Sequence, residues 1–421
     1  MYFLISLALL VHLMPSVLGL ESNLSAVMVT TPKDALVFQL SLKSALIHLV
    51  DVARFYVICP DAAKVKDLMV KSASTLNVSL AQIDSKVIFV DEKIFPFDGE
   101  KVVDTMIDAV RTKGQYPLKE GKSAFERTLW GKIGWFLQQL VKFYAGFVLH
   151  LDDFVILDSD LVWFKDVKFI ADKQKSADSG KITYNYASST QHHGAYIATM
   201  KRIVGVDPFS YKPFRSGVVH HIVISKPILQ VMKEKAESLH SGLSFWQVLL
   251  HESAFEMTCK APNPGVCGAG STLSEYEMYL HYAQTHFPDT VNLRPLMWAN
   301  GPMPGLLYNP DPSDPGPVLS SDSFRYKWAK PPNSNSNQVL HRQMAADAAA
   351  GFHYVGYHNY AKRRYFELHK EDIDELCVDV ARMPGRDGNT TCAYVMLDES
   401  KETMESWFKG CSCFMARHFA N

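Results

Sequence analysis

The run Phe154-Val155-Ile156-Leu157-Asp158-Ser159-Asp160 ends an apolar stretch in two carboxylates, and Leu161-Val162-Trp163-Phe164 follows directly. A short apolar run that ends in acidic residues is typical of a buried strand whose last residues reach the edge of a sheet. On an extended segment, carboxylates at positions i and i+2 point the same way. They then suit one hard divalent cation, Mn²⁺ or Mg²⁺, whose remaining positions accept diphosphate oxygens. The sequence therefore predicts a metal site on Asp158 and Asp160; the alternative is a strand end whose acidic residues meet solvent.

Upstream of this run, strand-like and helix-like segments alternate. We expect strands over residues 26–31, 54–59 and 86–90, and helices over residues 34–50 and 62–76. This alternation predicts βαβ units, and hence an α/β fold with a mainly parallel sheet flanked by helices. Ligands of such sheets bind beyond the carboxyl ends of the strands, which is where the two carboxylates are expected.

The segment directly before the acidic strand, residues 134–143, has the pattern of a helix. Its apolar stripe is assigned to the core. The polar positions that remain for a ligand cleft or for solvent are Gln138, Gln139 and Lys142.

The second half of the chain continues the pattern to about residue 300. Strands are expected over residues 181–186 and 215–224, the second entered through Gly217. Ser225 is expected to cap a helix that has Pro227 in its first turn. Prolines with interspersed Gly, Asp and Asn mark residues 301–335 as an irregular, ordered surface loop. We expect one catalytic domain over residues 20–370 and a cysteine-rich tail over residues 371–421.

The N-terminus has the features of a secretory signal peptide. Residues 1–13 are almost wholly apolar and Pro15 breaks the run. Val17 and Gly19, small or aliphatic residues at the −3 and −1 positions, suit cleavage after Gly19. The alternative is an uncleaved anchor, but the apolar run is short for a bilayer span. Three N-glycosylation sequons, at Asn23, Asn77 and Asn389, fit this route. The sequence thus predicts a protein of the endoplasmic reticulum or Golgi lumen, or a secreted one, with no integral membrane span after cleavage.

Seven cysteines are present. Cys59 lies in an apolar strand and is predicted to be a buried thiol. The other six favour disulfides in an oxidising compartment, including a disulfide-tied C-terminal appendage; they are Cys259, Cys267, Cys377, Cys392, Cys411 and Cys413. Zinc is the competing interpretation for the tail cluster, but no C-x₂-C pair is present.

Composition and charge exclude some classes of partner. The chain has 421 residues, of which 47% are hydrophobic, so it can bury a substantial core. Its net charge is −1, with acidic and basic residues well mixed. Neither nucleic acid nor an anionic membrane surface is therefore an expected partner.

Five segments in order resemble the nucleotide-diphospho-sugar transferases of GT-A fold, and in particular a little-characterised glycosyltransferase-like family of unknown function. The resemblance covers roughly residues 26–366. It is carried by Gly134–Lys142, Leu157-Asp158-Ser159-Asp160, Ser216-Gly217-Val218-Val219-His220-His221, Ser274-Glu275-Tyr276-Glu277 and His353-Tyr354-Val355-Gly356-Tyr357-His358-Asn359-Tyr360-Ala361-Lys362.

The resemblance implies a GT-A-like sheet and a metal-dependent transfer of a sugar from a nucleotide-diphosphate sugar to the hydroxyl of a glycan, glycoprotein or other acceptor. It implies that Asp158 and Asp160 hold the metal together with a late histidine, and that Glu275 faces the acceptor. For this histidine His358 fits better than His353, because Lys362, Arg363 and Arg364 follow it and suit phosphates. The residues expected to contact the donor are Gln138, Lys142, Ser159, Gly217, His220 and Lys362.

Two carboxylates open the segment Ser274-Glu275-Tyr276-Glu277. Ser274 and Glu277 form a capping box in pattern, which predicts a structural role for Glu277. Glu275 is then left as the candidate base for an inverting transfer, and the helix N-terminus favours its ionised form. His220 and His221 alternate across their predicted strand, so at most one of them faces the cleft, and His220 is preferred; the alternative for either is a core or surface histidine.

Three functions compete on the sequence alone. The first is a luminal or secreted glycosyltransferase. The second is a D-x-D phosphohydrolase that forms an aspartyl-phosphate, although the usual Gly or Thr after the second Asp is replaced by Leu161. The third is a non-catalytic, lectin-like protein of GT-A fold. The donor sugar, the nucleotide, the acceptor and the stereochemical outcome stay open.

Overall fold

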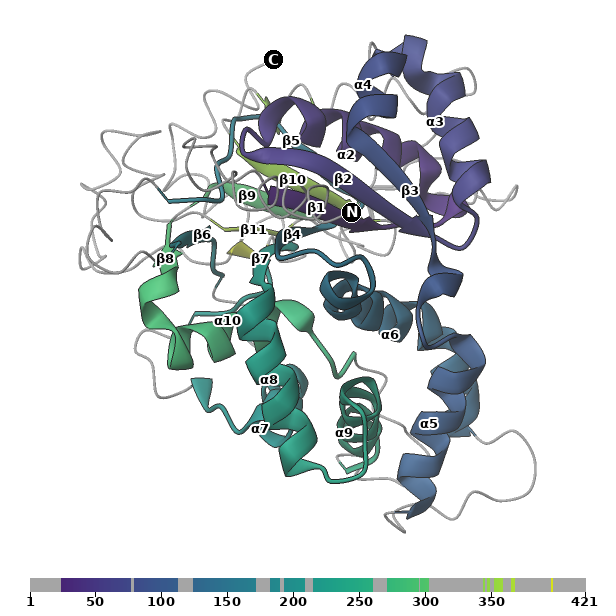
Figure 1. The fold of residues 1–421 in the computed structure, drawn as a ribbon, viewed down its shortest axis with the longest axis vertical. Helices are drawn as coiled ribbons and strands as arrows, with labels where there is room; N and C mark the ends of the chain where they lie inside the picture. Colours follow the sequence, from purple (N-terminus) through teal and green to yellow (C-terminus); the bar gives the residue numbers. More distant parts are fainter. Residues whose placement is uncertain are drawn as a thin grey trace, which may run out of the picture.

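A computed structural model of the protein describes most of the chain up to residue 302 and short stretches beyond it (Figure 1). The described residues are 24–76, 79–112, 124–171, 182–189, 193–208, 215–259, 271–294, 296–302, 344, 347–348, 352–358, 365–367 and 395–396. Buried apolar side chains from Leu24 to Tyr357 form one cluster. The elements of both halves of the chain therefore share one core.

The central sheet has five strands in the order β3–β2–β1–β4–β7. They are β1 (Leu24–Val29), β2 (Val52–Cys59), β3 (Val87–Asp91), β4 (Asp153–Asp158) and β7 (His221–Ser225). The first four are parallel, and β7 runs antiparallel to β4. Strands β1 and β4 are apolar along most of their length because the sheet is covered on both faces. Their register places Asp158 beside Val29, at the carboxyl ends of both strands.

A second sheet has the strand order β12–β11–β9–β10–β5. Its strands are β5 (Leu161–Trp163), β9 (Trp298–Pro302), β10 (Tyr354–His358), β11 (Tyr365–Glu367) and β12 (Val395–Met396). Strand β10 is parallel to β9 and antiparallel to β5. Because only Ser159 and Asp160 separate β4 from β5, the chain passes from the first sheet into the second at the acidic pair. A short parallel ribbon joins β6 (Tyr184–Tyr186) to β8 (Val291–Leu293).

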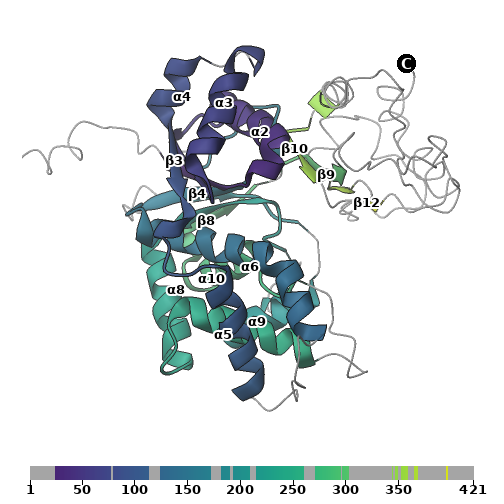
Figure 2. The same ribbon diagram turned by 90° about the vertical axis from the view of Figure 1, so that its right-hand side faces the viewer.

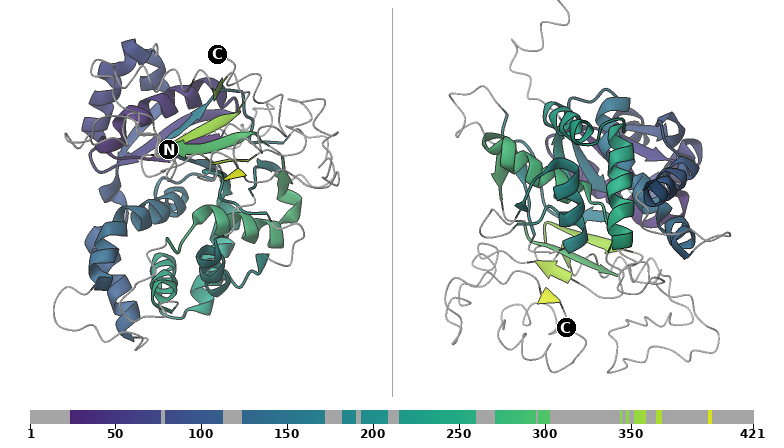
Figure 3. Two further views of the ribbon diagram at one scale, coloured as in Figure 1. Left: turned by 180° about the vertical axis from the view of Figure 1, so that it is seen from behind. Right: turned by 90° about the horizontal axis from the view of Figure 1, so that it is seen from below.

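Helices cover both faces of the central sheet (Figures 1 and 2). On one face lie α2 (Ala35–His48), α3 (Ala62–Leu76) and α4 (Leu80–Lys86). On the other lie α5 (Gly99–Thr112), α6 (Ala124–Val148), α7 (Gly194–Val204), α8 (Lys226–Leu239), α9 (Phe245–Cys259) and α10 (Glu275–His286). Short 3₁₀ turns occupy Pro32–Asp34, Glu92–Ile94 and Pro288–Thr290. Seen from below, the teal and green helices of the second half lie in front of the purple strands (Figure 3).

Helix α6 packs under β1 and β4, and α10 packs against β7. The part of α6 around Lys142 lies beside the carboxyl end of β4, whereas its last turn, at Gly146, lies against Phe154 near the start of that strand. The first turn of α10 faces the same carboxyl end. These two helices supply the side chains that surround the acidic pair.

The predicted α/β class, with a mainly parallel sheet flanked by helices, is confirmed. The first three strands and the two helices predicted between them, α2 and α3, lie within a few residues of the predicted bounds, and α4 is an additional helix before β3. Ser225 is the N-cap residue of α8, with proline in the first turn, but its side chain makes no capping hydrogen bond.

Three predicted bounds are wrong. The strand expected over residues 215–224 begins only at His221, because Ser216 pairs with Ser189 in an isolated bridge and the backbone bends before β7. The strand expected over residues 181–186 is limited to Tyr184–Tyr186. The loop expected from residue 301 starts inside β9, which continues to Pro302.

Several sequence-based predictions fall outside the described residues: the signal peptide, the three sequons, residues 303–335 of the predicted loop, Lys362 and the tail cysteines. Cys59 is described, and it is a buried free thiol as predicted. Burial raises its pKa to about 11. No helix within the described ranges is long and apolar enough to cross a membrane.

Candidate functional site

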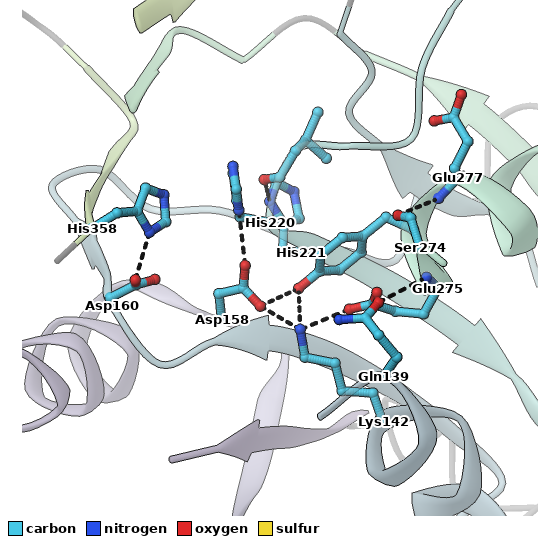
Figure 4. Close-up of polar contacts among 12 residues, drawn as sticks. Gln139, Lys142, Asp158, Asp160, His220, His221, Ser274, Glu275, Glu277 and His358 are labelled. Atoms are coloured by element: carbon cyan, nitrogen blue, oxygen red, sulfur yellow. Dashed lines mark hydrogen bonds and ion pairs between the residues drawn. The ribbon is translucent and has the colours of Figure 1, made fainter. Parts of the chain in front are cut away.

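The acidic pair sits where the chain changes sheets. Asp158 is the last residue of β4, and Ser159 and Asp160 form a turn before β5. The prediction of one extended segment with two parallel carboxylates is therefore wrong in its geometry. The turn gives each carboxylate a different set of partners, as the close-up in Figure 4 shows.

Asp158 lies at the centre of a buried polar cluster. Its Oδ1 accepts hydrogen bonds from the Lys142 ammonium and, at 2.7 Å, from the Tyr276 hydroxyl. Its Oδ2 lies 2.8 Å from His220 Nδ1. Lys142 also donates to Glu275 Oε1 at 2.7 Å, and both of these side chains are 1% exposed. One buried cation is thus shared by two carboxylates, Asp158 and Glu275 (Figure 4).

This sharing separates the acidities of the two carboxylates. Burial opposes ionisation of Asp158, but Lys142 and His220 outweigh it and hold the pKa of Asp158 well below its usual range. Burial also disfavours the charged form of Lys142, yet the two carboxylates raise its pKa. Burial raises the pKa of Glu275, and Lys142 only partly offsets that rise. Asp158 is therefore the permanent anion, and Glu275 is the member of the cluster best placed to take up a proton. The helix N-terminus was expected to favour ionised Glu275, and the backbone hydrogen bond there does lower the pKa, but burial has the larger effect.

His220 is held by hydrogen bonds at both ring nitrogens. Its Nδ1 faces Asp158, and its Nε2 lies 2.8 Å from Asn300 Nδ2 of β9. Because the amide donates to Nε2, the ring proton lies on Nδ1 and is donated to Asp158. Burial lowers the pKa of His220, which fits this neutral form. His220 has a left-handed backbone with φ of 65° and precedes β7. A bend, and not strand alternation, is therefore what aims it at the cleft.

His221 turns the other way, into the core. Its ring packs on Trp163, Phe169 and Tyr354, and its Nδ1 donates to the Val219 carbonyl. Burial, followed by the charge of Arg294, lowers its pKa to about 3.

The buried His221 predicts a measurable loss of stability in acid. Between pH 6.5 and about 3 the unfolded chain binds a proton at His221 that the folded chain does not, so stability falls as pH decreases. This group alone contributes a slope of about 1.4 kcal/mol per pH unit in that window. In His221→Phe, the free energy of unfolding measured by urea denaturation should vary less steeply between pH 7 and 5. An unchanged slope would mean that His221 is not buried in its neutral form.

Asp160 meets His358 across a sequence separation of 198 residues. Asp160 Oδ2 lies 2.5 Å from His358 Nδ1, and Asp160 raises the pKa of His358 against the effect of burial. The backbone aligns the pair, because Tyr357 N–H donates to the Asp160 carbonyl at 2.9 Å. Gly356 leaves room for the side chains of His358 and Asn300, since a Cβ at Gly356 would lie 2.4 Å from Asn300 Oδ1 and 2.6 Å from His358 Nε2.

The Asp160–His358 pair fits a divalent metal ion in its chemistry. Asp160 Oδ1 is a buried carboxylate oxygen with no hydrogen-bond partner among the described residues, and carboxylate with imidazole suits Mn²⁺. Asp158, the third predicted ligand, has both oxygens engaged by Lys142, Tyr276 and His220. Across the part of the chain that is described, no group of three or more His, Cys, Asp or Glu side chains is arranged to hold a metal as it stands.

The predicted capping box is half present. Ser274 Oγ accepts from the Glu277 N–H at 3.2 Å, as expected. The Glu277 carboxylate does not return to the Ser274 backbone; its Oε2 accepts from Ser216 Oγ at 2.6 Å and from Gly217 N–H at 2.8 Å. Glu277 is therefore structural, but it anchors the segment before β7 and not its own helix end.

Gly217 lies against the first turn of α10. A Cβ at Gly217 would stand 2.2 Å from the Tyr276 carbonyl oxygen. This surface is filled by protein backbone, so the described surroundings of Gly217 support a packing role and not the predicted contact with a donor.

Gly217→Ala is expected to destabilise the protein by about 1–3 kcal/mol, because the colliding atom is backbone that cannot rotate away. Gly131→Ala on α6 is the matched control. A Cβ there meets nothing within 4 Å, and alanine in a helix is favoured over glycine by roughly 0.5–1 kcal/mol. Thermal denaturation should therefore shift the two variants in opposite directions, and equal midpoints would contradict the close packing of Gly217.

The structure brings together some predicted site residues and adds others. Lys142, Asp158, His220 and Glu275 are in one cluster, and Asp160 and His358 lie beside it. Ser159 is buried in the turn between the two carboxylates. On α6, Gln139 and not Gln138 reaches the cluster, since its Oε1 accepts the Glu275 N–H at 3.2 Å.

Tyr276 and Asn300 were missed by sequence reasoning. Tyr276 lies between the two carboxylates of the segment Ser274-Glu275-Tyr276-Glu277, which were the residues assigned roles from the sequence. Asn300 is in β9 and has no motif around it, so only its pairing opposite Gly356 identifies it.

Comparisons with known proteins identify a family for the chain but no function. A search of curated proteins found no match. A family model, described as a family of unknown function (DUF6492), matches residues 23–292. The match includes Lys142, Asp158, Asp160, His220 and Glu275, whereas His358 lies beyond it. Because the model covers more than half of the chain, the protein belongs to this family of unknown function, DUF6492.

Proposed function

We infer that the protein is a metal-dependent glycosyltransferase of the secretory pathway. It would move a sugar from a nucleotide-diphosphate sugar to an acceptor hydroxyl on a GT-A-like scaffold. The observation that carries the proposal is the convergence, at the carboxyl end of β4, of Asp158, Asp160 and His358 on a mainly parallel sheet. Such a sheet edge is where α/β proteins bind nucleotides.

Asp160 and His358 are the residues that would hold the metal, Mn²⁺ or Mg²⁺. When bound, the ion supplies positive charge that stabilises the departing diphosphate. Asp158 would join this set only by exchanging one of its present partners. In the proposal, His220 orients Asp158, and Asn300 orients His220, so the carboxylate is held in place from two sides.

Glu275 is the candidate general base. Its Oε1 is bound by Lys142, while Oε2 is buried without a hydrogen-bond partner among the described residues. Burial raises its pKa, and a raised pKa brings a carboxylate closer to the range in which base catalysis is effective near neutral pH. The proton of an acceptor hydroxyl would move to Oε2 as the hydroxyl oxygen attacks the sugar.

Neither alternative function is favoured by the cluster. For an aspartyl-phosphate mechanism Asp158 must attack phosphorus, but both of its oxygens accept hydrogen bonds. For a non-catalytic protein, Lys142 with two carboxylates would be an expensive feature, because buried charges cost several kcal/mol in desolvation.

The proposal is tested by incubating the 421-residue chain with a panel of nucleotide sugars, with Mn²⁺ or with EDTA. Release of a nucleoside diphosphate that requires Mn²⁺ supports the glycosyltransferase. Release of inorganic phosphate alone supports the phosphohydrolase, and binding without turnover of any donor supports the non-catalytic protein.

Glu275→Gln is expected to reduce sugar transfer by about 10²–10⁴-fold, the usual contribution of general-base catalysis. Glutamine keeps an oxygen for Lys142 but cannot take the proton. Stability should be unchanged or higher, because the folded state raises the pKa of Glu275 and so disfavours its ionised form at neutral pH. Transfer rates and melting temperature measure both effects.

Glu277→Gln is the matched comparison for Glu275→Gln. It should retain transfer per folded molecule and lose about 1–3 kcal/mol of stability, because the anchors to Ser216 and Gly217 weaken. Full activity of Glu275→Gln would rule out the carboxylate-base mechanism and leave a retaining transfer as the better account.

A further inference from the structure

Aromatic side chains continue from the charged cluster along α6. Trp135 precedes Lys142 by about two helical turns and lies on nearly the same side of the helix. Its ring stacks on Tyr196 of α7, with the ring centroids 6.4 Å apart and the planes inclined by 10°. Burial raises the pKa of Tyr196, and the nearby charges of Glu275 and Asp158 add to the rise. The stacked pair therefore lies about two helical turns along α6 from Lys142, the residue that binds the candidate base Glu275.

One side of this pair is open. Side chains on a helix lean toward its N-terminus, over the residues three and four positions earlier, and for Trp135 the residue four positions earlier is Gly131. A Cβ at Gly131 or at Gly134 would meet no atom of the described residues within 4 Å. The exposed ring of His193 also contacts Tyr196, with the ring centroids 4.9 Å apart. Trp135, Tyr196 and His193 together are called the aromatic ledge below.

The aromatic ledge also has a polar group without a protein partner. Trp135 Nε1 is buried and donates to no acceptor among the described residues. Buried donors are almost always satisfied, so this N–H is available to an acceptor that the described residues do not supply.

We propose that the aromatic ledge binds a sugar ring of the acceptor. The apolar C–H face of a pyranose packs on flat aromatic side chains, and a hydroxyl beside that face accepts the hydrogen bond of Trp135 Nε1. The inference rests on the proposed function and adds the class of acceptor to it. The acceptor is a glycan, and a sugar unit next to its reacting hydroxyl occupies the ledge while the hydroxyl faces Glu275.

The test uses the 421-residue chain on a printed array of unmodified glycans, without nucleotide or metal. The wild type should be retained on a subset of glycans. Trp135→Ala should lower the affinity for these glycans by about tenfold or more, since truncated tryptophans are among the costliest losses in binding sites. Trp135→Phe keeps a ring and most of the packing but lacks the N–H, and a loss of about threefold to tenfold is expected.

Trp130→Ala is the matched control. Trp130 is on the same helix and is 44% exposed, but it lies about 140° around the helix from Trp135; its loss should leave glycan affinity unchanged. Equal affinities of the wild type, Trp135→Ala and Trp135→Phe overturn the inference, and so does a wild type that is retained on no glycan. The donor half is measured separately, by Mn²⁺-dependent nucleotide release without acceptor. Failure of the ledge is therefore distinguishable from failure of the proposed function.

Discussion

Replacing Lys142 with methionine is expected to lower the free energy of unfolding by about 3–5 kcal/mol, the cost of leaving buried charges without their partner. The ammonium of Lys142 is 1% exposed and is the cation that Asp158 and Glu275 share. Methionine fills a similar volume, so the loss reports on charge and not on a cavity. Urea denaturation at pH 7.5 measures it.

Two further variants test whether the loss of stability in Lys142→Met comes from unpaired buried charge. Lys142→Met combined with Glu275→Gln removes one of the two unpaired charges and should recover about 1–3 kcal/mol, a coupling expected of residues in direct contact. Lys201→Met breaks an ion pair with Asp207 whose lysine is 59% exposed and should cost less than about 1 kcal/mol. Similar losses for Lys142→Met and Lys201→Met would contradict the buried cluster.

Asp160→Ala is expected to reduce metal-dependent nucleotide release by about 10³-fold or more, because several kcal/mol of charge stabilisation depends on the ion. The fold should survive, since Asp160 lies in a turn and its removal deletes only the contact with His358. Asp166→Ala is the control: this aspartate is 72% exposed and pairs with His48. Initial rates with Mn²⁺ measure the effect, and an active Asp160→Ala would remove the metal from the mechanism.

The strand order of the first half follows from local patterns. Apolar runs of strand length alternate with helical segments, and parallel strands joined by helices leave few arrangements. The apolar run before Asp158 placed the acidic pair at a strand end for the same reason. The ends of a strand cannot be predicted from its own residues where pairing with a distant segment decides them. At Ser216, a bridge to Ser189 delays the start of β7 until His221.

The site could be predicted only in part, because its contacts are long-range. Helical periodicity marks Lys142 as a polar position, but its burial depends on Asp158 and Glu275, which lie 16 and 133 residues away. The structure places His220, and not His221, at the cluster, through a left-handed backbone that no residue pattern indicated. The role of Asn300 could not be predicted, since its side chain lies in the space that a Cβ at Gly356, a residue far along the chain, would fill.

The measurement that tests the central claim most directly is calorimetric titration of the 421-residue chain with UDP and with GDP, in Mn²⁺ and in EDTA. The account predicts that one of the nucleotides binds at least about tenfold more tightly with Mn²⁺, a difference of about 1.4 kcal/mol. That gain should vanish in Asp160→Ala and persist in Asp166→Ala. Equal affinities with Mn²⁺ and with EDTA in the wild type, or a gain that survives Asp160→Ala, would contradict a metal–diphosphate site at the carboxyl end of β4.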